Sequence, residues 1–234
     1  MITIRIADLN VRLKNRYQYV ELLCRDYITE ESQIDFEVEA SETDISEEMK
    51  NAECEANRAY AEAICLHRKI AERLWQYDAF LLHAALIECD GQGYAFAARS
   101  GTGKTTHIRL WKKLLGARVG VVNGDKPIVR LTESGVIAYG TPWNGKEGMG
   151  ENRSCPVRGL CFLDRGVENE IHAIPTEEAA MRLFPQIYLP SEACAVEKTM
   201  DLLDEFVWRV SFWHLHCNME DGAAELSHRR MTEE

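Results

Sequence analysis

A glycine-rich segment that could bind phosphate lies at residues 98–107, which read ARSGTGKTTH. It follows an apolar run and precedes IRLWKKLL, a run of helical character, and this strand–loop–helix context is typical of a phosphate-binding loop. Glycines in the loop would let backbone N–H groups turn toward phosphate oxygens, and the start of the helix adds partial positive charge. Lys104 would reach the outer phosphates, and the Thr105 hydroxyl could ligate Mg²⁺. The predicted nucleotide-binding residues are Ser100, Gly101, Thr102, Gly103, Lys104, Thr105 and Thr106.

The first position of this motif departs from the usual pattern G-x-x-x-x-G-K-[ST], because Ala98 stands where glycine is usual. Alanine fits there only if the backbone does not need a positive φ. His107 begins the body of the helix, where a packed or surface histidine is the more common case. The run SGTGKTT after a strand still favours phosphate binding over a glycine turn formed by chance.

A candidate acid, Asp125, lies in VVNGDKP, about twenty residues after the loop. Phosphoryl-transfer sites often place an acid at the end of a neighbouring strand, where it meets Mg²⁺ or takes the proton of a nucleophile. The alternative is a plain turn, because N-G-D and K-P are turn formers whatever the function. The spacing of about twenty residues from the glycine-rich loop favours a functional acid over a plain turn.

The segment GTPWNGKEGMGEN, residues 140–152, is too long and glycine-rich for a tight turn. We interpret it as a loop that covers or selects a substrate, with a solvated surface loop as the alternative. The residues predicted to act there are Trp143, Lys146, Glu147 and Asn152, with Lys146 countering phosphate charge.

The apolar pattern predicts the elements that must position these residues. Residues 80–89 and 93–98 are expected to form a β-hairpin around the turn DGQG, directly before the glycine-rich loop. Further strands are expected at 119–123, 128–131, 136–139, 157–163, 170–174 and 212–217, and helices at 176–184, 192–209 and 220–231. The predicted fold class is α/β with a mixed sheet.

The first 77 residues are expected to form a small α+β region, separate from a nucleotide-binding core at 78–234. Strands are predicted within 2–13 and at 34–39, and short helices at 17–26 and 43–48, the second capped by Ser41 or Thr43. A long amphipathic helix is predicted over 51–77. Packing on its own domain is the favoured interpretation of this helix, and contact with a partner is the alternative.

Composition excludes several classes of protein. The chain has 234 residues with 46% hydrophobic and 28% charged residues, an ordinary globular balance that excludes disorder over the whole length. The net charge of −11 argues against nucleic acid or an anionic membrane as partner. It does not argue against a small anionic ligand, which a local nest of N–H groups can hold.

The chain is expected to be a soluble, cytoplasmic protein, because no apolar run is long enough to span a membrane and the N-terminus lacks a secretory signal. Its eight cysteines are scattered without a C-x-x-C pair, so buried free thiols are expected rather than a metal site.

These motifs in this order resemble the HPr kinase/phosphorylase family and its relatives, which share a nucleotide fold with phosphoenolpyruvate carboxykinase. The resemblance rests on an apolar strand containing His83, the turn DGQG, a second strand, SGTGKTT and then Asp125. It is clearest over residues 78–175, and FWHLHCNMEDGAAELSHRRM is similar to the end of the smaller relatives. Residues 1–77 resemble that branch only loosely.

The resemblance implies a carboxykinase-like core with a histidine, His83, near the transferring phosphate and with Asp125 as one acid of the family's pair. The chain departs from the family because Gly124 and Lys126 flank a lone acid, so Glu147 would have to help or Asp125 would serve alone as base or metal ligand. Lys126 would lower the pKa of Asp125 and weaken it as a base. The chain is also too short for decarboxylation chemistry, and the signature of the reverse, dephosphorylating reaction is missing.

The function expected is therefore an ATP-dependent kinase. It would transfer the γ-phosphoryl group, with Mg²⁺ at Thr105 and Asp125, to a hydroxyl of a peptide, protein or small molecule. Asp125, His83, Lys104 and Lys146 are the expected catalytic residues. A nucleotide-binding scaffold without transfer is the alternative, and phosphate donors other than ATP and a homo-oligomeric state stay open.

Overall fold

Three short strands form a small sheet near the N-terminus of the computed structural model, which describes residues 1–51 and 57–233. β1 (Ile2–Ile6) and β2 (Leu9–Lys14) form a hairpin, and β3 (Phe36–Glu39) lies parallel to β2. Their apolar residues alternate with polar ones, so one face of the sheet is buried. The strands expected in this region are confirmed.

Three helices accompany this sheet: α1 (Gln18–Leu23), α2 (Glu42–Asn51) and α3 (Arg58–Ala71). Of the two caps expected for α2, the serine is the one observed. The Ser41 hydroxyl accepts the N–H of Asp44 at 3.1 Å, and the Asp44 carboxylate accepts the N–H of Ser41 at 2.8 Å. This reciprocal pair satisfies donors that the helix start would otherwise leave free.

The single long helix expected over 51–77 is wrong in its described part. α3 ends at Ala71, and a separate 3₁₀ turn follows at Leu74–Tyr77. Asp78 then adopts a left-handed conformation with φ of +52°, which ends the helical run before the next strand. The part of the expected helix at 52–56 lies outside the described residues.

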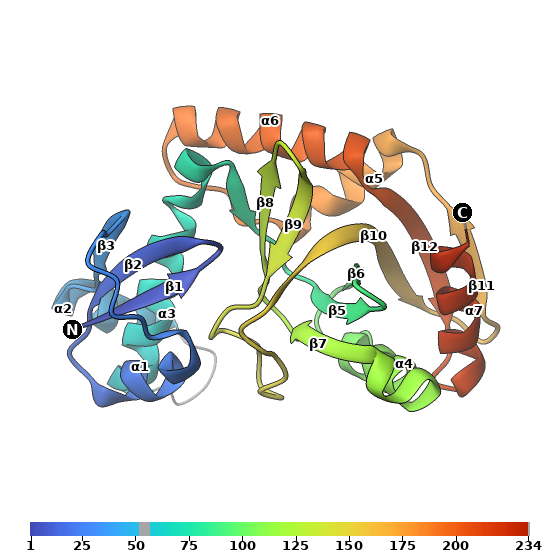
Figure 1. Ribbon diagram of the computed structural model, residues 1–234, viewed down its shortest axis with the longest axis horizontal. Helices are drawn as coiled ribbons and strands as arrows, with labels where there is room; N and C mark the ends of the chain where they lie inside the picture. The colour runs from blue at the N-terminus through green and yellow to red at the C-terminus, as the bar shows by residue number, and fades with distance from the viewer. Residues whose placement is uncertain (52–56, 234) are drawn as a thin grey trace.

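A nine-stranded mixed sheet forms the larger part of the molecule, and its longest strand is β10 (Ser154–Arg165). β6 (Gln92–Ala97) and β12 (Ser211–Cys217) lie parallel to β10 on its two sides. The other strands are β4 (Ala79–Leu81), β5 (Ala85–Cys89), β7 (Val119–Asn123), β8 (Ile128–Thr132), β9 (Gly135–Tyr139) and β11 (Glu170–Ala173). The sheet curls because the first residues of β10 pair instead with β9, which leads on to β8 and β4 (Figure 1).

The hairpin expected before the glycine-rich loop is confirmed as β5 and β6, but its first run of apolar residues is not one strand. β4 pairs with β8, whereas β5 pairs with β6 and β7, so the chain crosses from one part of the sheet to another at residues 82–84. The three N–H groups there donate to three carbonyls outside the hairpin. These bonds run from Leu82 to Pro127 at 3.0 Å, from His83 to Gln186 at 2.6 Å and from Ala84 to Asp125 at 3.1 Å.

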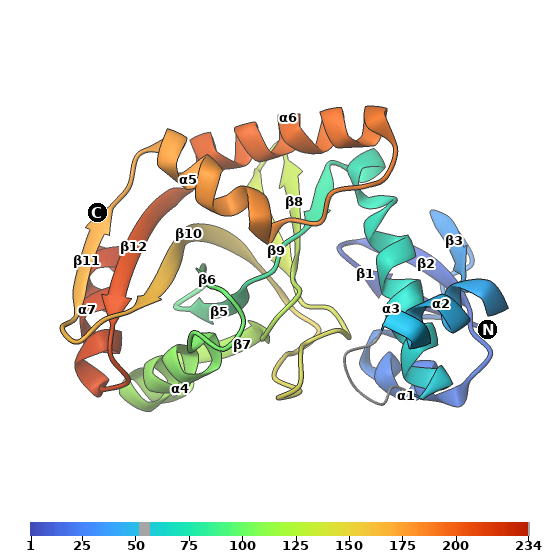
Figure 2. The same cartoon turned by 180° about the vertical axis from the view of Figure 1, so that it is seen from behind.

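Helices cover both faces of this sheet (Figures 1 and 2). α4 (Lys104–Leu115) and α7 (Asp221–Thr232) pack on one face, over a buried cluster that includes Trp111. α5 (Thr176–Leu183) and α6 (Ala193–Arg209) pack on the other face. The helices expected in the C-terminal half are confirmed.

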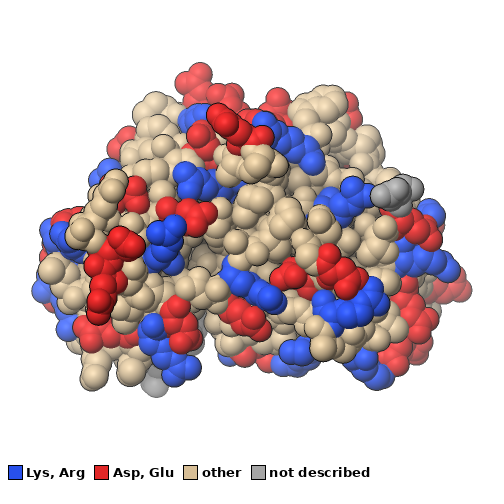
Figure 3. All heavy atoms as spheres, in the orientation of Figure 1, with Lys and Arg blue, Asp and Glu red and all other residues tan. Residues whose placement is uncertain are grey.

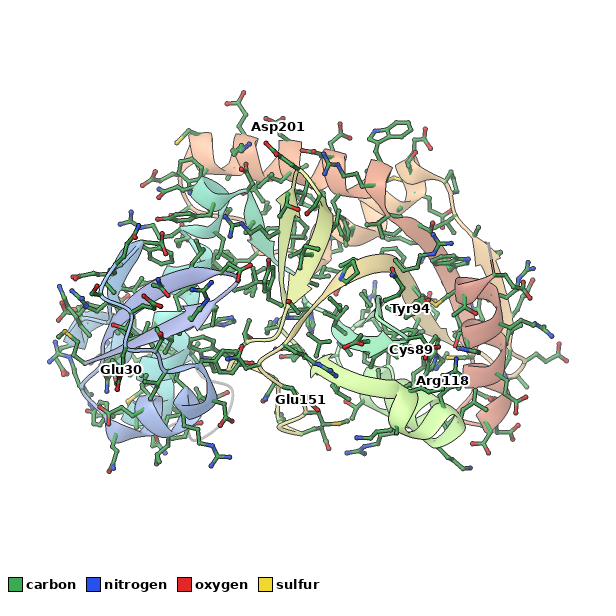
Figure 4. All side chains as sticks on the ribbon, viewed as in Figure 1. Glu30, Cys89, Tyr94, Arg118, Glu151 and Asp201 are labelled. Atoms are coloured by element: carbon green, nitrogen blue, oxygen red, sulfur yellow. The ribbon has the colours of Figure 1, made fainter. Side chains whose placement is uncertain are left out.

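Figure 4 shows the β5–β6 hairpin carrying Tyr94 and Cys89 on the side of α4 and α7. In the same view, Asp201 projects from α6 away from the sheet into solvent. Each helix thus turns an apolar stripe to the sheet and charged residues outward, as its periodicity requires.

The two expected parts of the chain share one hydrophobic core. The core of the N-terminal sheet and α3 continues into Ile128, Tyr139 and Trp143 of the larger part. The Trp143 ring stacks on His67 with centroids 4.6 Å apart, and its Nε1 donates to the carbonyl oxygen of Ala63 at 3.0 Å. The α3 helix is therefore packed within its own molecule, which is the favoured interpretation of this amphipathic segment.

The seven cysteines of the described residues are free thiols, and five of them are buried, as expected. Cys54 lies outside the described residues. Among the described residues, no cluster of three or more histidine, cysteine or acidic side chains could hold a metal ion, and no helix has the length and hydropathy of a membrane span.

Trp143 is predicted to contribute strongly to stability through its contacts with α3. Trp143→Phe removes the indole N–H bond to Ala63 and part of the buried surface, so we expect the free energy of unfolding to fall by about 1–3 kcal/mol. Trp208→Phe is the matched control, because Trp208 is 72% exposed and should change stability by less than about 0.5 kcal/mol. Urea unfolding measures both, and equal values for the two variants would contradict the anchoring role.

The stacked His67 ring should make stability depend on pH. Burial lowers the pKa of His67 from 6.5 to about 3, so the unfolded chain takes up a proton on acidification before the folded chain does. The stability that this histidine contributes is complete above pH 6.5 and falls as the pH drops from there toward 3, with about 1–2 kcal/mol lost by pH 5. In His67→Phe, the loss of stability between pH 7 and pH 5 should shrink by that amount; an unchanged loss would refute the assignment.

Candidate active site

The glycine-rich loop (Ala98–Gly103) leaves the carboxyl end of β6 and enters α4 at Lys104. Gly101 and Gly103 have φ values of +76° and +129°, which favour glycine. Ala98 does not have a positive φ, so alanine fits the first position of the motif. The expected strand–loop–helix order is present.

The Lys104 side chain folds back over the loop. Its Nζ donates to the carbonyl oxygen of Ala98 at 3.0 Å and lies 3.3 Å from Nε2 of His83. Burial lowers the pKa of this ammonium, and the Asp125 carboxylate opposes that shift. Lys104 is 9% exposed, so an oxyanion that replaced the carbonyl would find a cation already stripped of most of its water.

His83 links the loop lysine to the candidate acid. Its Nε2 lies 3.3 Å from Oδ1 of Asp125 and at the same distance from Lys104 Nζ. The side chains of His83 and Asp125 are 29% and 31% exposed, so both stay accessible from the cavity. Three residues that are far apart in sequence therefore meet at one edge of the sheet.

One proton decides which of these contacts is a hydrogen bond. A neutral imidazole carries its proton on one nitrogen. With the proton on Nε2, His83 donates to Asp125; with Nε2 bare, it accepts from Lys104. Nε2 cannot serve both partners in these ways at once, so the tautomer of His83 decides which of the two contacts is a hydrogen bond.

A buried asparagine that sequence reasoning did not single out holds Asp125 in place. The Asn123 Oδ1 accepts the N–H of Asp125 at 2.8 Å and that of Lys126 at 2.6 Å. Its Nδ2 donates to the carbonyl oxygen of Thr141 at 3.2 Å, and Asn123 has no exposed surface. The N-G-D signal in the sequence is the signature of such an Asx turn.

The long loop at 140–152 packs directly on this turn. The Gly124 N–H donates to the carbonyl oxygen of Met149 at 2.7 Å. A β-carbon on Gly145, whose φ is +81°, would lie 2.9 Å from Cβ of Asp125. Only glycine allows the loop to approach the acid this closely.

The four residues predicted to act in this loop divide into two pairs. Lys146 and Glu147 line the cavity beside Asp125, and Glu147 pairs with Arg109 of α4. Trp143 and Asn152 do not line this cavity, and their contact with a substrate stays a prediction. Trp143 is buried against α3, and the Asn152 amide donates to the carbonyl oxygen of Asp26 at 2.8 Å.

The cavity between the two loops, here called the loop cavity, has a volume of 530 Å³. Besides His83 and Asp125, it is lined by the predicted loop residues Ser100, Gly101, Gly103, Lys104, Thr105 and Thr106. Thr102 lines instead a neighbouring cavity of 520 Å³, here called the α4–β12 cavity, which shares Gly103 and Thr106 with the loop cavity. Leu110, Leu163 and Met219 give this neighbour apolar walls.

The charges around Asp125 keep its carboxyl group ionised. Burial alone would raise its pKa, but the contact with His83 and the charges of Lys126 and Lys104 outweigh burial, and the pKa is lowered from its ordinary value. Burial lowers the pKa of Lys126, and Asp125 opposes that shift. The expected effect of Lys126 on Asp125 thus has the expected sign, and it makes Asp125 a better anionic ligand than a base.

The residues present fit a magnesium ion. Mg²⁺ is commonly held by one or two carboxylates, and it takes its remaining ligands from substrate phosphates and water. Asp125 and the Thr105 hydroxyl line the same cavity and supply such an oxygen set. A site of this kind needs no cluster of three protein ligands.

A second residue that the sequence did not reveal supports the glycine-rich loop from the sheet. The Arg165 guanidinium, at the end of β10, donates to the carbonyl oxygen of Gly101 at 2.6 Å. Arg165 also lines the α4–β12 cavity. Nothing in the run CFLDRG marks this arginine, because β10 and the loop are brought together only by the parallel pairing of β10 with β6.

Similarity to solved structures is distant. The structure of the HPr(Ser) kinase/phosphatase from Coxiella burnetii matches with a TM-score of 0.37 and 9% sequence identity, over 66% of this chain and 99% of that chain. A likeness at this level carries no conclusion about activity. No curated protein matches the sequence.

A protein-family match covers most of the larger part of the molecule. The family is described as "SynChlorMet cassette protein ScmC", a description that names no activity, and it matches residues 53–221. The matched range includes the glycine-rich loop, His83, Asp125 and the whole 140–152 loop. The chain belongs to the ScmC family of SynChlorMet cassette proteins.

Proposed function

We propose that the chain is a Mg²⁺-assisted kinase that transfers the γ-phosphoryl group of ATP to a hydroxyl group. The observation that carries this proposal is the meeting of Lys104, His83 and Asp125 beside a glycine-rich loop at the start of α4. A loop that only bound phosphate would not need a histidine beside its lysine and a carboxylate beside that histidine. Phosphoryl transfer needs both a fixed cation and an acceptor-facing acid.

The nucleotide would lie across the two adjoining cavities. Its phosphates would enter the loop cavity, where the N–H groups of the loop and Lys104 neutralise their charge. Its nucleoside would enter the α4–β12 cavity, whose apolar walls at Leu110, Leu163 and Met219 suit a flat heteroaromatic base. The volume of 520 Å³ is ample for such a group.

The transfer would use the chain's own groups as follows. Lys104 would hold a γ-phosphate oxygen and stabilise charge in the transition state. Asp125 would orient the acceptor hydroxyl and, as the oxygen–phosphorus bond forms and the bond to the leaving ADP breaks, accept its proton directly or through His83. Asp125 and the Thr105 hydroxyl would hold Mg²⁺, which would neutralise part of the phosphate charge.

A nucleotide-binding scaffold of the same fold is the second candidate. The observation that favours it is the lowered pKa of Asp125, together with glycine rather than a second acid at position 124. A carboxylate this well stabilised is a weak base. Both candidates predict nucleotide binding, but only the kinase predicts turnover.

Lys104→Ala is predicted to weaken MgATP binding at least about 30-fold, since a charge-assisted bond of about 2 kcal/mol is lost. The matched control is Lys112→Ala, which removes an exposed lysine from the same helix and should leave the affinity within about twofold. Titration calorimetry measures both, with circular dichroism to check the fold. An unchanged dissociation constant for Lys104→Ala would rule out the phosphate-loop assignment.

Asp125→Asn is predicted to reduce kcat for ADP release by about 10²–10⁴-fold, because the amide can neither take the proton nor neutralise the metal. Nucleotide affinity without Mg²⁺ should stay within about threefold or improve slightly, since the lost charge is negative. Measuring kcat against Mg²⁺ concentration separates the two roles of Asp125. A kcat restored by high Mg²⁺ assigns the residue to the metal, and a loss that persists assigns it to the proton.

Tight nucleotide binding by the unaltered protein, without ADP release or phosphorylation of any acceptor, would refute the kinase and leave the scaffold. Acceptors of several classes should be tried, including water alone, small alcohols and serine-containing peptides.

A further inference from the structure

A third cavity, here called the α3 cavity, lies on the other side of His83 from the glycine-rich loop and has a volume of 360 Å³. His83 is the residue that lines both the loop cavity and the α3 cavity. The remaining walls come from α3, from the end of β4, from Lys126 and from residues 185–188. Phosphate-binding residues 98–106 take no part in it.

The walls of the α3 cavity are tied to the candidate catalytic residues. The Gln186 carbonyl oxygen accepts the His83 N–H at 2.6 Å, and the Tyr188 N–H donates to the carbonyl oxygen of Leu81 at 3.0 Å. The Tyr188 hydroxyl donates to the Glu72 carboxylate at 2.7 Å, which fixes the ring against the end of α3. The cavity is thus a built space with fixed walls, not a gap between loose loops.

Two buried polar atoms around this cavity have no hydrogen-bond partner among the described residues. They are Nε2 of His67 and the side-chain Oε1 of Gln186, which come from opposite walls. Each such atom costs about 1–3 kcal/mol unless a ligand or water satisfies it. Because burial lowers the pKa of His67 to about 3, the ring is neutral at pH 7 and offers one hydrogen bond at Nε2.

The charge of the α3 cavity is opposite to that of the whole chain. Lys126 and Arg68 line it, and none of its described lining residues is an aspartate or glutamate. Arg68 pairs with Glu48 at 2.9 Å, but the Lys126 ammonium forms no ion pair within the described residues. A half-buried ammonium without a contacting anion is a site for an anionic group.

We propose that the α3 cavity binds the phosphoryl acceptor, and that this acceptor is a small hydroxylated anion whose carboxylate or phosphate lies on Lys126. This inference rests on the proposed kinase function and names its acceptor class. The polar part of the acceptor lies against the side chains of His67 and Gln186, and its carbon skeleton meets Leu81 and Ile187. Its hydroxyl lies beside His83, where the α3 cavity meets the loop cavity that holds Asp125 and would hold the γ-phosphate.

The size of the cavity decides between a small molecule and a polypeptide. A volume of 360 Å³ lies at the lower end of small-ligand sites, which span about 300–1,000 Å³. A peptide acceptor would insert only one side chain and would leave Lys126 without a fixed anion. The shared chemistry is therefore a compact anion with a free hydroxyl, and carboxylate and phosphate forms are distinguished by experiment.

The test compares three acceptors that share a three-carbon skeleton: glycerate, glycerol 3-phosphate and uncharged glycerol. ADP release is measured with saturating MgATP, and the binding of each acceptor without nucleotide is measured by titration calorimetry. We expect at least one of the two anions to bind and to be phosphorylated with kcat/KM at least about tenfold above that of glycerol. Whichever anion is preferred identifies the carboxylate or the phosphate.

Lys126→Met should raise KM for the preferred anion about tenfold or more above any change in KM for glycerol, since both acceptors share the effect of Lys126 on Asp125. Its matched control is Lys112→Met, the same change at an exposed position of α4, which should alter neither value. Equal losses for the anion and for glycerol in Lys126→Met would overturn the assignment of the anion to Lys126.

Gln186→Leu provides a second variant that does not depend on charge. If Oε1 is kept for a ligand, replacing it with an apolar group should weaken anion binding about threefold or more while leaving the unfolding midpoint unchanged or raised. Weaker folding with unchanged binding would show a purely structural role and would overturn the proposal.

The outcomes separate this inference from the kinase proposal. Calorimetric binding of an anion that Lys126→Met abolishes, without any turnover, supports the α3 cavity as an anion site and refutes the kinase. Turnover with a serine-containing peptide but neither binding nor turnover of the small anions supports the kinase and refutes the small acceptor.

Discussion

The crossing of the chain at residues 82–84 is the constraint on which the rest of the site depends. Three consecutive N–H groups there bond to the carbonyl oxygens of Asp125 and Pro127 in one turn and of Gln186 in a distant segment. No side chain is needed for these bonds, so the backbone alone fixes His83 between the turn that carries Asp125 and the segment that carries Gln186. The loop lysine then needs only to fold back over its own loop to reach the histidine.

Much of the fold could be predicted because its elements carry local signals. The β5–β6 hairpin, the C-terminal helices and the strands of the larger sheet follow from apolar periodicity and turn residues. The break at residues 82–84 could not be predicted, because FLLHAALIEC is apolar throughout and the break is set by pairing with β8 on one side and β6 on the other. The 3₁₀ turn after α3 likewise ends at a left-handed Asp78, which sequence periodicity does not reveal.

The residues of the candidate site likewise divide into those with a local sequence signal and those without one. The glycine-rich loop, Asp125 and Lys146 have sequence signals, and they line one cavity in the structure. Asn123 has a signal that was interpreted only as a turn, although its side chain holds Asp125. Trp143 is predicted to contact a substrate because the 140–152 loop is long and glycine-rich, but the sequence does not reveal that its indole bonds to α3. Arg165 and Gln186 are set by long-range pairing alone and have no local signal.

The local charge of the cavities differs from the net charge of the chain. The face seen in Figure 3 mixes acidic and basic side chains without a large area of one sign. The cations around the site are held in cavities by the fold, with Lys104 and Lys126 each losing water to burial. A chain with a net charge of −11 can therefore offer an anion two locally positive cavities.

The stacking of Trp143 on His67 has a consequence for where the molecule could be divided. A fragment that started at residue 78 would keep every residue of the loop cavity, yet it would expose the tryptophan that holds the 140–152 loop and the apolar surface that α3 covers. Exposed apolar surface of that kind drives self-association. The described residues before 78 contribute no group to the loop cavity, but they bury Trp143 and so support the loop that lines this cavity.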